Sequence, residues 1–288
     1  MMILVFGHSG QVATELASYD GVMRLSRADA DLTNPAACVA AIAKNAPQAV
    51  INAAAYTAVD KAEGDEDTAF AVNATAPIAI AEACKAQGIP FVHISTDYVF
   101  KGSGNNAWKP TDETGPLGVY GATKLAGEDG IRAIGSTSAI LRTSWVFSAH
   151  GNNFVKTMLR LGAERDKLTI VADQIGGPTS AQSIAAACVT IAEQLKSSPE
   201  KAGTYHFAGT PNVSWADFAR NIFAQAGIIC DVTDIPTSAY PTPAKRPLNS
   251  RLNCATTTEA FGVVPCDWRS DLGDVIAALN TPKSELVQ

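Results

Sequence analysis

The sequence has few charged residues and no cluster of Lys and Arg. Only 17% of its 288 residues are charged, and the formal net charge is −6. Because proteins that bind nucleic acid neutralise successive phosphates with Lys and Arg, the lack of a basic cluster argues against nucleic acid as a partner. The hydrophobic share of 47% still supports a substantial buried core, which excludes disorder as a description of the whole chain.

Long apolar runs and paired cysteines are also missing. No apolar run approaches the roughly 18 residues that would predict a membrane-spanning helix, so we expect no membrane partner and a soluble, cytoplasmic protein. The stretch Met1–Phe6 has no basic flank and leads directly into Gly7, which predicts a first buried strand rather than a signal peptide. The six cysteines are scattered without a C-x-x-C pair, so we expect reduced thiols that pack in the core.

Short apolar runs alternate with helical patterns through the first half of the chain. The runs predicted to form strands are Ile3–Phe6, Val22–Leu25, Ala49–Asn52, Phe91–Ser95 and Ala139–Leu141. The helices predicted between them are Gln11–Ser18, Pro35–Ala46, Glu63–Gln87 and Tyr120–Ala133. Strands that alternate with helices form parallel sheets, so we predict an α/β protein with a Rossmann-type, doubly wound parallel sheet.

The second half alternates less regularly. Its predicted helices are Asn153–Leu161, Ser180–Leu195, Trp215–Ala226 and Asp271–Leu279, and a proline-rich span covers Pro236–Pro247. This change predicts a second, smaller α/β domain that binds the substrate. We place the dinucleotide-binding domain at residues 1–148, completed by 176–209, and the substrate domain at 149–175 and 210–288.

A glycine-containing turn follows the first predicted strand and opens a helix. Gly7 would permit the turn, Gly10 would let the backbone approach a phosphate, and Ala13 is small enough for close packing of helix on strand. The spacing is G-x-x-G-x-x-A rather than G-x-G-x-x-G. The turn therefore predicts a dinucleotide site, and an ordinary strand-to-helix turn is the alternative.

The end of the second strand indicates which dinucleotide binds. A carboxylate there would bind the ribose diol of NAD, whereas a cation accommodates the extra phosphate of NADP. The chain has Ser26 and Arg27 at this place, which favours NADPH. Asp29 and Asp31 follow closely, so NADH stays open.

Tyr120 and Lys124 form the most informative pair in the chain. Residues four apart share one face of a helix, so we expect the Lys124 charge to lower the pKa of Tyr120 and make it a proton donor near neutral pH. Thr96 ends the fourth predicted strand, at the sheet edge where α/β proteins bind ligands, and could orient a substrate oxygen. A structural role for Thr96, capping the next loop, is nearly as well supported.

Taken together, these motifs resemble those of the extended short-chain dehydrogenase/reductases, and specifically of the dTDP-4-dehydrorhamnose reductases. The resemblance covers nearly the whole chain. The segments that carry it are Gly7–Gln11, Asn52–Glu63, Ser95–Phe100, Tyr120–Glu128, Thr143–Val146, Gly151–Leu161, Thr237–Pro243 and Arg246–Asn253. It implies transfer of a hydride from NAD(P)H to the C4 ketone of a nucleotide-linked deoxysugar, which yields dTDP-L-rhamnose.

The resemblance also implies roles for individual residues. The catalytic residues would be Thr96, Tyr120 and Lys124. Together with Gly7 and Arg27, the cofactor would be bound by Gly10, Gln11, Val12, Asp31, Leu32, Ala55, Tyr56, Thr57, Ile94, Tyr120 and Lys124. The substrate would be bound by Thr96, Asp97 and Trp145, whose indole offers a flat apolar face to a sugar ring. From the later segment we add Arg246 and Asn249, with Arg251 as a further cation for a diphosphate.

The sequence departs from related families at two places. Nucleotide-sugar dehydratases carry Thr-Asp-Glu where this chain has Tyr98 in the third position, which disfavours dehydration. Some reductases bind a divalent metal between subunits through acidic residues. This chain keeps Glu15 but has Gln182 and Ala186 where acids are expected, so we predict no metal and leave a homodimer open.

Two alternative functions remain at this stage. One is a reductase or epimerase of another nucleotide sugar. The other is a regulatory subunit that binds a nucleotide without catalysis. Because Thr96, Tyr120 and Lys124 are all present, catalysis is favoured over regulation.

Overall fold

A parallel sheet of six strands lies at the centre of the protein in the computed structural model, which describes residues 1–281. The strands lie in the order β10, β5, β4, β3, β1, β2, and every neighbouring pair is parallel. Their bounds are β1 (Ile3–Phe6), β2 (Val22–Leu25), β3 (Ala49–Asn52), β4 (Phe91–Thr96), β5 (Ser138–Thr143) and β10 (Gly203–His206). The predicted α/β, Rossmann-type fold is confirmed, and the strand order reverses between β1 and β3, where such sheets bind ligands.

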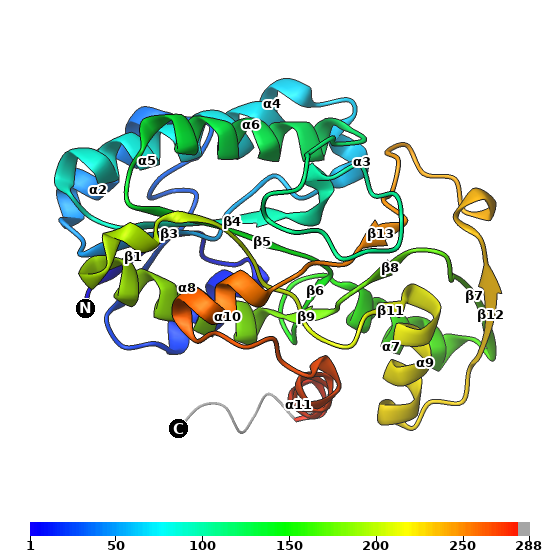
Figure 1. The fold of residues 1–288 in the computed structure, drawn as a ribbon. Coiled ribbons are helices and arrows are strands. Elements are labelled where there is room, and N and C mark those ends of the chain that lie inside the picture. The colour runs from blue at the N-terminus through cyan, green and yellow to red at the C-terminus, as the bar shows by residue number, and fades with distance from the viewer. Residues whose placement is uncertain (282–288) are drawn as a thin grey trace.

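Helices cover both faces of this sheet (Figure 1). One apolar core joins the sheet to α1 (Gln11–Glu15), α8 (Ala181–Ser197) and α10 (Ala255–Phe261). The other core joins it to α2 (Pro35–Asn45), α5 (Ala76–Gln87) and α6 (Val119–Ile134). Because the sheet is buried on both faces, the sequences of its strands are continuous apolar runs and do not alternate between apolar and polar residues.

A further apolar core lies outside the two cores of the sheet. Phe147, Phe218 and Trp268 are its largest fully buried side chains. Its helices are α7 (Phe154–Glu164), α9 (Trp215–Ala226) and α11 (Trp268–Asn280), and its parallel strand pair is β7 (Lys167–Val171) with β12 (Asp231–Ile235). Most of these elements, α7, α9, β7 and β12, are at the lower right of Figure 1. Short strands connect it to the rest of the protein: β6 (Val146–Phe147), β8 (Ile175–Gly176), β9 (Thr179–Ser180), β11 (Val213–Ser214) and β13 (Asn249–Ser250). The domain boundaries stay a prediction, and positions 282–288 of the second domain lie outside the described residues.

The predicted helix Glu63–Gln87 is interrupted in the structure. It is preceded by α3 (Val59–Ala62) and consists of α4 (Glu66–Phe70), a π-helical turn η2 (Ala71–Thr75) and α5. The side chain of Asn73 in η2 binds the backbone of Tyr56 in both directions, with distances of 2.9 and 3.2 Å. This contact with a distant loop cannot be read from the apolar periodicity of the segment.

Candidate functional site

A cleft of about 1020 Å³ opens at the carboxyl ends of β1, β3 and β4. Its lining contains every residue predicted to bind the cofactor: Gly7, Gly10, Gln11, Val12, Arg27, Asp31, Leu32, Ala55, Tyr56, Thr57, Ile94, Tyr120 and Lys124. Thr96, Asp97 and Trp145 line the same cleft. The tertiary structure thus brings together side chains that are more than 130 positions apart in the sequence.

The glycine turn has the geometry that a pyrophosphate requires. Gly7 has φ of +124°, and a Cβ there would lie 3.2 Å from the Cβ of Ala13. Only glycine therefore combines this backbone with close packing on α1. Gly10 is the N-cap of α1 and leaves the first turn without a side-chain cap, so its backbone N–H groups can serve an anion.

The loop after β2 presents one exposed cation to the cleft. The Arg27 side chain is 79% exposed, and its Nε donates to Asp31 Oδ2 over 2.9 Å. The Ser26 hydroxyl donates to Asp29 Oδ2 over 2.6 Å. Both carboxylates are therefore already paired, which leaves the guanidinium edge of Arg27 as the group suited to a phosphate.

Gln11 differs from the other predicted cofactor residues in what its side chain binds. Its Oε1 accepts from Ser148 Oγ at 2.9 Å and from Asn153 Nδ2 at 3.0 Å, and its Nε2 donates to Val146 O at 3.3 Å. The side chain therefore ties α1 to the segment 146–153. Its backbone N–H lies in the first turn of α1, where N–H groups lack a helical partner and can serve a cofactor.

Helix α6 carries Tyr120 and Lys124 and lies unusually close to the end of β4. A Cβ at Gly121 would overlap with the carbonyl oxygen of Tyr98, so only glycine permits this approach. The Tyr98 and Tyr120 rings then meet edge to face, with centroids 5.4 Å apart. Close packing at Gly121 thus places Tyr120 in the same cleft as Thr96, whose hydroxyl acts to lower the pKa of the Tyr120 phenol.

The expected lowering of the Tyr120 pKa by Lys124 is wrong for this structure. Loss of solvent around the phenol raises the pKa of Tyr120 above its usual value, although the Thr96 hydrogen bond opposes this shift. The Lys124 amine is directed elsewhere, to His93 Nε2 at 3.1 Å and Ile94 O at 2.8 Å. The four-residue spacing predicted that Tyr120 and Lys124 share a helix face, but it could not show that His93 and Ile94 bind the Lys124 amine.

Thr96 has the structural capping role weighed from the sequence, and its catalytic role stays a prediction. Its Oγ1 accepts from the Tyr98 N–H at 3.2 Å and so caps the short helix η3 (Asp97–Val99). It also lines the cleft next to Asp97 and Thr143. Asp97 Oδ2 and Thr143 Oγ1 are buried without a hydrogen-bond partner in residues 1–281, which is the state expected of groups that bind a polar ligand.

Trp145 lines the cleft with one face of its ring already covered. Its ring stacks on Trp215 with centroids 3.6 Å apart and planes 11° from parallel. The backbone of Gly176 lies close to the same indole, since a Cβ there would be 2.8 Å from Cε2. A sugar ring can therefore reach only the part of Trp145 that these neighbours leave open.

Arg246 and Asn249 are not among the residues that line the cleft. Arg246 Nη2 donates to Asp60 Oδ2 over 2.6 Å. Asn249 is 1% exposed; its Nδ2 donates to Asn106 O at 2.8 Å and its Oδ1 accepts from Arg251 Nη1 at 2.9 Å. The substrate contacts expected of Asn249 and Arg246 stay predictions, and in this structure the Asn249 amide holds the loop at residue 106. Burial raises the pKa of Tyr98, which lines the cleft, and Arg246 acts to lower it, so the Arg246 side chain lies near the cleft edge.

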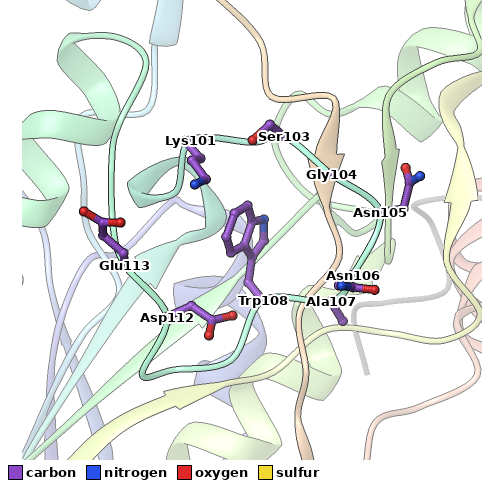
Figure 2. A pocket seen from close by; sticks show the side chains of 9 residues that line it. All are labelled: Lys101, Ser103, Gly104, Asn105, Asn106, Ala107, Trp108, Asp112 and Glu113. Atoms are coloured by element: carbon purple, nitrogen blue, oxygen red, sulfur yellow. The ribbon is translucent and has the colours of Figure 1, made fainter.

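A second hollow lies in the loop between β4 and α6 (Figure 2). Its volume is about 480 Å³, and its lining includes Lys101, Trp108 and Glu113. Trp108 stacks on Phe100 with centroids 4.8 Å apart and donates from Nε1 to Asn249 O at 3.1 Å. None of the predicted site residues lines this hollow.

Two features are absent from the described part of the chain. Residues 1–281 contain no group of three or more His, Cys, Asp or Glu side chains that could hold a metal ion. Glu15 instead lies 3.5 Å from His150 Nε2. Within the same residues, no helix has both the length and the apolar character needed to cross a membrane.

Several residues that support the site were missed from the sequence. Glu128, in α6, is 0% exposed and receives hydrogen bonds from Arg142 and Ser95, which hold α6 on β5 and β4. His93 contacts Lys124 from within β4. For His93 and Arg142 the sequence signal was polarity inside otherwise apolar strands, which has many other causes, and Glu128 looked like an ordinary charged residue of a helix.

The chain has close relatives among characterised proteins and solved structures. Residues 1–281 match the family model described as the RmlD substrate binding domain. The dTDP-4-dehydrorhamnose reductase of Sinorhizobium fredii is 41% identical over 97% of this chain and 98% of the relative.

Two solved structures are also similar. A dTDP-4-dehydrorhamnose reductase from Clostridium acetobutylicum superposes with a TM-score of 0.90, at 36% identity over 98% of this chain and 100% of that one. The Bacillus anthracis enzyme in complex with NADP superposes with a TM-score of 0.88, at 33% identity over 96% of this chain and 100% of that one. With a glycine turn, a phenol and an amine in one cleft, and with relatives that match over nearly its whole length, the chain belongs to the dTDP-4-dehydrorhamnose reductase family.

Proposed function

We propose that this protein reduces the C4 ketone of dTDP-4-dehydro-L-rhamnose to the alcohol of dTDP-L-rhamnose with NADPH. The observation that carries the proposal is that Thr96, Tyr120 and Lys124 line the same cleft as the glycine turn at Gly7. Family membership supports the choice of substrate. The cofactor would supply the hydride to the carbonyl carbon.

Tyr120 supplies the proton that the carbonyl oxygen needs. A raised pKa keeps the phenol protonated at neutral pH, and the protonated form is the one that a reductase uses as its acid. Thr96 orients the substrate oxygen from the end of β4. Asp97 and Thr143, each with a buried oxygen that has no partner in residues 1–281, supply polar contacts to the sugar.

Arg27 determines the preference between the two dinucleotides. Its guanidinium is exposed on the cleft and already oriented by Asp31, so a phosphate on the ribose gains a charge-assisted contact there. The carboxylates of Asp29 and Asp31 are both paired with neighbouring donors. NADPH is therefore favoured over NADH.

The alternative functions are less well supported. A non-catalytic regulatory subunit would not need a proton donor in the cleft, yet Tyr120 is positioned there together with Thr96 and Lys124. Dehydration lacks its carboxylate because Tyr98 occupies that position and packs on Tyr120. A homodimer and a cytoplasmic location stay predictions from the sequence.

The test is to mix the purified protein with NADPH and dTDP-4-dehydro-L-rhamnose and to follow the loss of NADPH absorbance. Substrate-dependent oxidation is expected, and its absence would remove the reductase assignment. Tyr120→Phe should lower kcat by roughly 10²–10⁴-fold while NADPH affinity is largely kept, because only a proton donor is lost. Tyr205→Phe is the matched control, since the Tyr205 hydroxyl binds Lys201 O outside the cleft.

A further inference from the structure

The indole of Trp145 is supported by residues that do not line the cleft themselves. Trp145 lines the cleft, and its ring stacks on that of Trp215 with centroids 3.6 Å apart. Trp145 also has φ of +49°, a left-handed backbone conformation that is costly for a bulky residue. Such a conformation persists only where its surroundings hold it. The groups that hold Trp215 therefore affect the face that Trp145 offers to a sugar.

Strand pairing places Gln174 opposite Trp215. Strands β8 and β11 are antiparallel, with Ile175 across from Ser214. Gln174, just before β8, therefore lies level with Trp215, just after β11. The indole Nε1 of Trp215 donates to Gln174 Oε1 over 3.1 Å. Because Gln174 is only 8% exposed, both ends of its amide need partners within the protein.

The other end of the Gln174 amide binds the loop at residues 236–247. Gln174 Nε2 donates to Thr237 Oγ1 over 3.1 Å, and the Thr237 hydroxyl donates to Asp173 Oδ1 over 2.6 Å. An indole N–H can only donate and a carboxylate can only accept, so a single assignment satisfies all of these groups. The amide oxygen faces Trp215, the NH₂ group faces Thr237, and the single hydroxyl proton of Thr237 faces Asp173.

The loop 236–247 extends from Gln174 to a helix at the cleft. Its far end is held by Asp60, which accepts from Arg246 Nη2 over 2.6 Å. Asp60 belongs to α3, whose Val59 lines the cleft. One end of the loop is thus bound to the residues behind the tryptophan stack, and its other end is bound to an element of the cleft itself.

We propose that Gln174 is a positioning residue for the sugar, which joins the Trp145–Trp215 stack to the loop 236–247 and fixes the indole face before the substrate binds. Gln174 and Thr237 are not among the residues that line the cleft, so their effect passes through Trp215 to Trp145. A face that is already fixed spares the substrate the cost of ordering it. The identity of the sugar rests on the proposed reductase function, whereas the contacts of the stack do not.

This role predicts a selective loss of substrate recognition. Gln174→Met removes both hydrogen bonds of the amide and leaves the Trp215 N–H without its partner. The KM for dTDP-4-dehydro-L-rhamnose should rise by roughly 5–50-fold, which is the effect expected when a polar group in a packed site loses its partner. The kcat and the KM for NADPH should stay close to wild type, because Tyr120 and the glycine turn take no part in these contacts. A lower kcat with an unchanged KM for the sugar nucleotide would overturn the proposal.

The indole N–H signals of the four tryptophans report on the contact directly. In the ¹H–¹⁵N spectrum of protein labelled at tryptophan, Gln174→Met should shift the signals of Trp215 and Trp145. Those of Trp108 and Trp268 should stay in place, because their Nε1 groups donate to backbone carbonyls elsewhere. An unshifted Trp215 signal would contradict the proposal. The spectrum needs neither substrate nor cofactor, so this outcome is separate from a failure of the reductase assay.

Thr237→Val tests the second contact of the amide and serves if Gln174→Met does not fold. The variant keeps the backbone N–H that donates to Asp173 but removes the hydroxyl that accepts from Gln174 Nε2. The Trp215 signal should shift again, and the KM for the sugar nucleotide should rise by less than in Gln174→Met because the Trp215 hydrogen bond is kept. A Trp215 signal and a KM that both match wild type would show that the loop is not coupled to the stack.

Gln194→Met is the matched control. The Gln194 amide is also bound at both ends, since its Nε2 donates to Phe261 O at 2.8 Å and its Oε1 accepts from Lys201 Nζ at 2.8 Å. Gln194 does not line the cleft, so its loss should leave the tryptophan signals and both KM values unchanged. A rise in the KM for the sugar nucleotide equal to that of Gln174→Met would mean that any lost amide contact has this effect, which would refute a specific role for Gln174.

Discussion

The buried ion pair between Glu128 and Arg142 gives the sharpest prediction about stability. Arg142 is 2% exposed and Glu128 is 0% exposed, and Arg142 donates to the carboxylate from Nε at 3.0 Å and Nη2 at 2.6 Å. Ser95 and Arg132 donate to the same carboxylate. Glu128→Gln keeps the shape of the side chain but removes its charge, which leaves Arg142 buried without a counter-ion.

The magnitude follows from the burial of both partners. Removing one member of a buried pair typically costs about 3–5 kcal/mol, because the remaining charge has lost its solvent and its partner. An unfolding entropy of about 2.1 cal/mol/K per residue gives roughly 600 cal/mol/K for 288 residues. We therefore expect Glu128→Gln to lower the melting temperature by about 5–8 °C.

Thermal and urea unfolding, followed by circular dichroism, measure this loss. Glu164→Gln is the control, because Glu164 pairs with Arg160 at 3.2 Å while both side chains are more than half exposed. Its loss should stay within about 0.5 kcal/mol. The double variant Glu128→Gln/Arg142→Met should recover part of the stability, since the unpaired charge is gone. A loss below about 1 kcal/mol for Glu128→Gln would refute the reasoning.

Three further predictions concern the cleft. Arg27→Ala should weaken NADPH binding more than NADH binding, as measured by fluorescence titration, and an equal effect on both would show that Arg27 does not contact the extra phosphate. Burial raises the pKa of Asp97 from 3.8 to about 6, so the native state keeps a proton that the unfolded state loses as pH rises through this window. Relative to Asp97→Asn, the wild type should lose up to about 3 kcal/mol of stability between these pH values, and a pH-independent difference would contradict this. Gly176→Ala should raise the KM for the sugar nucleotide, because the new Cβ would lie 2.8 Å from the Trp145 ring and displace it; an unchanged KM would argue against substrate contact by Trp145.

The main strands and several helices were predictable because local patterns determine them. The strands at residues 3–6, 22–25 and 49–52 and the helix at 215–226 have the predicted bounds. Strands buried on both faces appear as short apolar runs. Helix α9 begins after the capping residue Ser214 and ends before Gly227. Helix α10 was missed because a seven-residue helix has too few turns to show a period.

The residues near the C-terminus that were predicted to bind the substrate were the least predictable part of the site. Arg246 and Asn249 were assigned by residue type, since a cation and an amide suit a nucleotide sugar. Their partners, Asp60 and the carbonyl of Asn106, lie more than 140 positions away in the sequence. Nothing local to residues 246–251 indicates that these side chains are already bound.

By itself, the sequence determined the strands β1 to β5, the glycine turn at Gly7 and the spacing of Tyr120 and Lys124, because these depend on neighbours within a few positions. Only the tertiary structure decided the protonation states in the cleft. Solvent exclusion around Tyr120 and the contact of Lys124 with His93 depend on how α6 packs against β4. Since a pKa depends on burial and on groups from distant segments, helical spacing predicted the right pair of residues but the wrong direction of the Tyr120 pKa shift.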